Sequence, residues 1–79
     1  MSNLEMLKEK MKKFRDVWRQ KKYSEDGLFI CGVIAGSKEM HDNFGTTEQA
    51  FEKLYEFVQK YDSETDIIYQ ISKLAQVAD

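Results

Sequence analysis

The stretch LFICGVIA, residues 28–35, is apolar throughout, and its conformation decides the fold. It is rich in β-branched and aromatic residues, and apolar side chains occupy both of its alternating faces. A short run of this kind is typical of a strand that is covered on both sides. A turn follows at Gly36-Ser37, and residues 39–44 roughly alternate polar and apolar side chains. The sequence therefore predicts a β-hairpin over about 28–44.

The overlapping stretch CGVIAGSK, residues 31–38, resembles a phosphate-binding loop in composition but not in spacing. Such a loop needs a glycine, four spacer residues and then Gly-Lys-Ser/Thr, so that backbone N–H groups wrap the phosphates. Here only three residues separate Gly32 from Gly36, Ser37 precedes Lys38, and the spacers are strand formers. We therefore expect a buried strand that ends in a turn, and no nucleotide site.

Two segments, one on each side of the hairpin, show the apolar periodicity of helices. The first, about 3–22, has a start that Ser2 or Asn3 can cap. Its apolar stripe consists of Leu4, Leu7, Met11, Phe14 and Trp18. The second, about 46–61, begins with a capping box at residues 46–49. The exposed side of this helix carries glutamates four residues apart, and a cationic neighbour would relieve their mutual repulsion.

The last segment, TDIIYQISKLAQVAD at residues 65–79, fits two structures. As a helix capped by Ser63 it aligns Ile67 and Ile71; as a strand it also places Tyr69 on their face. Periodicity favours the helix. However, a lone two-stranded hairpin is marginal in water, and a strand with two apolar faces needs neighbours. We therefore predict a strand at about 66–77, which a crossover through the second helix brings beside the hairpin.

The predicted fold is one small α+β domain over residues 1–79, in the order α-β-β-α-β with a three-stranded sheet. If the last segment is helical, the order becomes α-β-β-α-α. The second helix would cover one face of the sheet, and the first would cover the other or pair with its copy. Spare apolar surface on so short a chain also predicts a homodimer.

Charge is strongly segregated along the chain. Residues 1–22 hold eight of the twelve Lys and Arg residues against three acidic ones, a net charge of +5, whereas the remainder carries −7. On a helix the basic groups form a stripe beside the apolar one. The predicted partner-binding residues are Lys8, Lys12, Arg15, Trp18, Arg19 and Lys22.

This basic stripe predicts docking on a protein with an acidic surface, or on a second copy of the chain. The alternative is a nucleic-acid-binding regulator, in which the cations follow phosphates while Trp18 and Tyr23 stack on bases. Because the rest of the chain is acidic and would repel a long polyanion, we favour the protein partner.

No set of residues predicts catalysis, a metal or a cofactor. Cys31 and His41 would approach across the hairpin, and a thiol–imidazole pair is a nucleophile in principle. Cys31 lies among apolar residues, however, where burial raises the pKa of a thiol and makes it inert. One Cys and one His fall short of a zinc site, and the acidic cluster of Asp62, Glu64 and Asp66 lacks the spacing of a calcium loop.

The sequence thus predicts a small non-enzymatic binding protein, a type common among phage-encoded inhibitors and regulators. The single cysteine rules out an internal disulfide and suits a reducing compartment. The N-terminal segment is charged throughout, unlike a secretory signal, and no segment is apolar enough to span a membrane. We expect a cytoplasmic protein.

Overall fold

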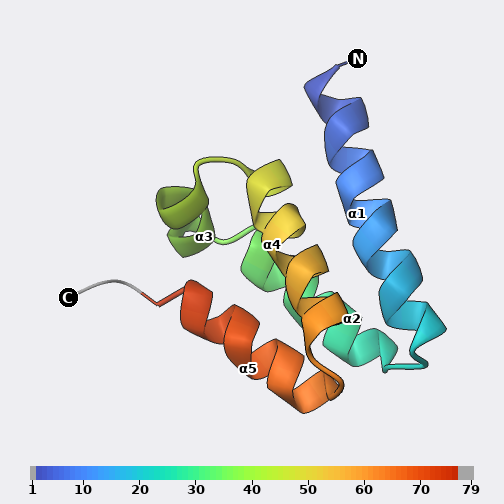
Figure 1. The fold of residues 1–79 in the computed structure, drawn as a ribbon. Helices are drawn as coiled ribbons and strands as arrows, with labels where there is room; N and C mark the ends of the chain where they lie inside the picture. Colours follow the sequence, from blue (N-terminus) through green and yellow to red (C-terminus); the bar gives the residue numbers. More distant parts are fainter. Residues whose placement is uncertain (1, 77–79) are drawn as a thin grey trace.

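The computed structural model describes residues 2–76, and within that range all regular secondary structure is helical, with no β-strand. The helices are α1 (Asn3–Gln20), α2 (Glu25–Ala35), α3 (Lys38–Phe44), α4 (Thr47–Lys60) and α5 (Glu64–Leu74). Helix α4 lies in the middle, with α1 along one side and α5 along the other, while α2 crosses behind it (Figure 1). Because α4 contacts each of the other four helices, it is the centre of the fold.

The predicted α+β fold is therefore wrong, and the error lies in the hairpin at 28–44. Its first arm belongs to α2 and its second to α3, so the alternative order with a helical last segment is wrong as well. The prediction of a strand at 66–77 is also wrong for the described residues, which form α5; residues beyond 76 lie outside them. The helices predicted at 3–22 and 46–61 are present as α1 and α4.

Capping explains why residues 28–35 form a helix. The hydroxyl of Ser24 accepts a hydrogen bond from the backbone N–H of Gly27 at 2.9 Å, and Glu25 and Asp26 occupy the first turn. These are the residues that favour a helix start. The SEDG sequence at 24–27 therefore begins α2.

The helical spacing of α2 buries Gly27, Cys31 and Ala35 on a single face. The remaining large apolar side chains of the segment lie on other faces, several of them exposed. A helix that is apolar all round lacks the periodicity that distinguishes it from a buried strand. This is the physical reason for the wrong hairpin.

The ends of the other helices follow from their caps. Ser37 caps α3, and α3 ends at Gly45, whose φ of 88° lies in the region that favours glycine. Ser63 caps α5 by accepting a hydrogen bond from the N–H of Asp66, as the helical alternative for this segment required. Once no hairpin is present, the argument that a third strand should complete a sheet no longer applies.

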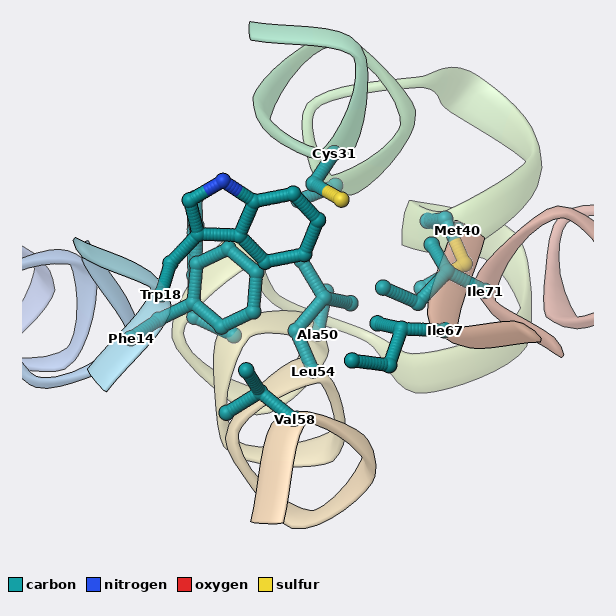
Figure 2. Packing of buried hydrophobic residues seen from close by; sticks show 11 residues of the cluster. Phe14, Trp18, Cys31, Met40, Ala50, Leu54, Val58, Ile67 and Ile71 are labelled. Atoms are coloured by element: carbon teal, nitrogen blue, oxygen red, sulfur yellow. The ribbon is translucent and has the colours of Figure 1, made fainter. Parts of the chain in front are cut away.

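All five helices contribute to one buried cluster (Figure 2). It consists of Phe14, Trp18, Cys31, Ala35, Met40, Ala50, Phe51, Leu54, Val58, Ile67 and Ile71. Among the described residues no polar or charged side chain is buried. The core is thus held by apolar burial, and the polar groups at its edge set the helix positions.

Trp18 connects the end of α1 to the start of α2. Its ring is fully buried. The centroid of the indole lies 5.6 Å from that of the Phe14 ring and 5.0 Å from that of the Tyr23 ring, which it meets edge-on. The indole N–H donates a 2.7 Å hydrogen bond to the carbonyl of Ser24. The carboxylate of Glu64 in turn accepts hydrogen bonds from the N–H and hydroxyl of Ser24, which ties α5 to the same point.

Two cations of the N-terminal segment fix α1 against α4. Lys10 forms an ion pair with Glu52 at 2.7 Å. Lys21 donates hydrogen bonds to the carbonyls of Val58 and Tyr61, at the C-terminal end of α4 where cations are favourable. The predicted cationic neighbour of the α4 glutamates is therefore confirmed, and it is α1 of the same chain.

Replacing Gly27 or Gly32 by Ala makes the same chemical change twice in α2, with opposite expected results. At Gly27 the added Cβ would lie 2.7 Å from Cζ2 of Trp18, and this overpacking should cost about 1–3 kcal/mol. At Gly32 no neighbouring atom lies within 4 Å of the added Cβ. Alanine there should therefore raise the free energy of unfolding by about 0.5–1 kcal/mol. Urea unfolding followed by circular dichroism measures both. Equal losses at the two positions would contradict the packing described.

Candidate interaction surface

A shallow apolar groove lies between α1 and α2, and residues of α4 also line it. The two helices meet at residues 21–24 and diverge from there (Figure 1). The groove has a volume of about 430 Å³ and is lined by Leu7, Met11, Phe29, Gly32, Val33, Thr47 and Phe51. We call it the α1/α2 groove. Three helices build it, so it exists only in the folded chain.

The α2 wall of the α1/α2 groove exposes large apolar side chains to solvent. Phe29 is 74% exposed and Val33 is 58% exposed, and Ile30 lies beside them at 44%. On the α1 wall, Met11 is exposed and Leu7 is half-buried. Scattered apolar residues are ordinary on a protein surface, but a contiguous patch marks an interaction site.

Gly32 forms the middle of the α2 wall. It lies inside a helix, where glycine is less stable than alanine by about 0.5–1 kcal/mol. No neighbouring atom within the described chain requires the absence of a side chain there. Gly27 is different, because Trp18 and Glu64 occupy the space that its side chain would need. The backbone of α2 is therefore open to close approach at Gly32.

A cationic edge borders the α1 side of the α1/α2 groove. Lys8, Lys12 and Arg15 surround Met11 in a second hollow. Arg15 also lines a third hollow, which shares Met11, Gly32 and Phe51 with the groove. The apolar wall and these three cations therefore form a continuous surface.

The six predicted partner-binding residues do not lie on one surface. Lys8, Lys12 and Arg15 form the cationic edge, and within residues 2–76 neither Lys8 nor Arg15 has an ion-pair partner. Trp18, by contrast, is fully buried and cannot be contacted. Lys22 is exposed after the end of α1, with a φ of 60°.

Two of these cations are paired with acidic groups of the same chain. Lys12 contacts Asp16 at 2.9 Å, and Arg19 contacts Glu25 at 2.7 Å. These hydrogen bonds lower the pKa of Asp16 and of Glu25. Together with Lys10 and Lys21, about half of the basic residues of the N-terminal segment therefore have partners inside the chain.

The exposure of Phe29, Ile30 and Val33 on α2 was not predicted, because these residues were expected in a buried strand. One feature of the sequence could have revealed them. If residues 25–35 are a helix, they have no polar face beyond the first turn, so some apolar side chains must face either solvent or a partner.

Cys31 and His41 do not come together, because their expected approach depended on the hairpin. Cys31 is fully buried in the core, whereas His41 is exposed on α3. Burial, with a smaller effect of the Glu64 carboxylate, raises the pKa of the Cys31 thiol to about 12. The predicted burial of Cys31 is confirmed, and at neutral pH its sulfur is protonated.

Two features are absent from residues 2–76, the part of the chain that the structure describes. No group of three or more His, Cys, Asp and Glu residues is arranged to hold a metal ion. None of the helices combines the length and the apolar character needed to cross a bilayer.

Comparisons of the chain with known protein families, with curated proteins and with solved structures give no match. The inference of function therefore rests on the α1/α2 groove and its cationic edge.

The buried thiol of Cys31 predicts a pH dependence of stability. Its pKa is about 12 in the folded chain against an ordinary 9.0. The unfolded chain therefore loses this proton first, and the free energy of unfolding falls as pH rises through that window. The slope is at most about 1.4 kcal/mol per pH unit.

Urea unfolding at several pH values above about 8 measures this effect. Cys31→Ala is the control, since it retains every other titrating group. The wild type should lose stability more steeply with rising pH than this variant. Parallel curves would contradict the burial of an ionisable thiol.

Proposed function

We propose that this chain is a small non-enzymatic binding protein that docks on a protein partner with an acidic surface. The observation that carries the proposal is the exposed apolar wall of α2, next to the cationic edge of α1. The two parts serve different needs of an interface. Apolar burial contributes affinity, while charge directs the encounter and the choice of partner.

Phe29 is the proposed anchor of the interface. Aromatic side chains at the centre of a patch carry a large share of binding energy, and Phe29 has the largest exposed fraction among the exposed large apolar residues. Lys8 and Arg15 supply charge that no acidic group of residues 2–76 neutralises through an ion pair. They are therefore proposed to contact the acidic residues of the partner.

The nucleic-acid alternative has weaker support. It relied on Trp18 and Tyr23 as stacking platforms, but Trp18 is buried and Tyr23 packs edge-on against it. An apolar groove also offers little to a phosphate backbone, which binds through cations and N–H donors. A protein partner uses both parts of the surface.

We also propose that the chain is an inhibitor or regulator of the phage type. A binding protein of this size acts by covering part of a larger protein. We further propose the cytoplasm as its compartment. The support is the single cysteine, which remains a free and buried thiol.

Reversing the charge of Lys8 and Arg15 tests the proposed function. Tagged wild-type chain should capture a protein from lysate of the cells that encode it. The double variant Lys8→Glu, Arg15→Glu should capture at least about tenfold less, because like charges repel across the interface. The matched control is Lys60→Glu, Lys73→Glu, which reverses two exposed lysines that do not line the groove.

Nuclease treatment and gel retardation at low salt address the alternative. The captured protein should remain after nuclease treatment, and the chain should not retard DNA or RNA. Capture that persists in the Lys8, Arg15 variant would contradict the proposed function. Retardation that the same variant abolishes would establish the nucleic-acid reading instead.

A further inference from the structure

We propose that the α1/α2 groove receives an amphipathic helix of the partner, which lies over Gly32 with an acidic flank toward α1. This inference rests on the proposed function and specifies the occupant of its site. The observations that carry it are the shape of the groove, the glycine in its wall and the placement of charge on one edge.

The shape of the groove suits a helix. Its two walls are helices that diverge from the connection at 21–24, and its base is formed by Thr47 and Phe51 of α4. A third helix can place a ridge of side chains into the space between two others. Recognition of this kind uses apolar anchors at positions i, i+3 or i+4, and i+7 of the bound helix.

Gly32 adds a constraint on distance. Alanine at this position would make α2 more stable without touching any neighbour. The missing side chain at Gly32 lets another backbone come close to α2. Phe29 and Val33 flank this point along the groove, so the bound helix would cross α2 at Gly32 and pack against both side chains.

Charge orients the occupant. Lys8, Lys12 and Arg15 follow one another at i, i+4 and i+7 along the α1 edge, where they form a row parallel to the helix. The α2 wall carries acidic residues only in its first turn. An acidic row on one flank of the bound helix would meet the cations, while its other flank would face the apolar wall.

A second copy of the chain does not supply such a helix within residues 2–76. The exposed large apolar residues lie on α1, α2 and α5. On α1 the exposed apolar residues lie beside cations, which would repel the cationic edge. On α2 acidic residues occur only in the first turn, so the helix has no acidic flank. On α5 the only large apolar residue that is exposed is Tyr69. Helix α4 carries an acidic row, Glu48, Glu52 and Glu56, but its apolar face is buried in the core and is not available to a second copy. A foreign helix is therefore the better match.

Selection from a displayed peptide library tests this inference. The probe is a library of helix-forming peptides of about 18 residues, roughly five turns, with apolar and charged positions varied. Selection on the wild-type chain should enrich peptides with apolar residues at i, i+3 or i+4, and i+7 and with Asp or Glu along one flank. Absence of enrichment, or enrichment of peptides without this pattern, overturns the inference.

Two variants locate the binding site of the enriched peptides. Val33→Glu should weaken binding at least about tenfold, because it places a charge in the apolar groove. Gly32→Ala should weaken binding several-fold although the same change stabilises the fold, so loss of binding cannot be attributed to unfolding. Lys60→Glu, Lys73→Glu should bind as the wild type does. Unchanged binding by both groove variants overturns the inference.

Sedimentation equilibrium identifies the other occupant. The homodimer predicted from the sequence assumed spare apolar surface on a sheet, which the described residues do not form. We now expect a monomer at every concentration tested; a dimer that Val33→Glu dissociates would assign the groove to a second copy and overturn the foreign helix. Failure of the library selection, combined with capture that still depends on Lys8 and Arg15, removes only this inference. If capture is also independent of those two residues, the proposed function fails with it.

Discussion

The hydrogen bond from the indole of Trp18 to the carbonyl of Ser24 is the contact on which the rest of the structure depends. It holds the end of α1 against the start of α2, where the large ring fills the centre of the core. The same serine caps α2 and donates to Glu64 at the start of α5. Three helices, α1, α2 and α5, therefore meet at a single residue, and Gly27 leaves the space that this meeting requires.

This arrangement determines which face of α2 is hidden. With Gly27 held against Trp18, helical spacing directs Cys31 and Ala35 into the core. Phe29 and Val33 must then point away from it, although they are as apolar as core residues. The packing of the core thus produces the exposed wall of the α1/α2 groove.

Predictions from the sequence were correct where local chemistry and periodicity agreed. The stripe of α1 and the capped start of α4 both combine a cap with a clear apolar face, and both helices are present. At residues 28–35 composition indicated a strand, and the absence of a polar face removed the periodicity that would have indicated a helix. At 64–74 the periodicity was right, but the expected hairpin outweighed it. One wrong element therefore caused two errors.

The charge segregation, the two amphipathic helices and the positions of Lys8, Lys12 and Arg15 can be read from the residue order. They depend on helical spacing alone. The burial of Trp18, the ion pairs of Arg19 and Lys10 within the chain, and the exposure of Phe29 on α2 instead depend on how the helices pack. A helix with apolar residues on all sides has no amphipathic pattern to show which side is buried. The side of α2 that is buried is therefore set by the helices that pack against it.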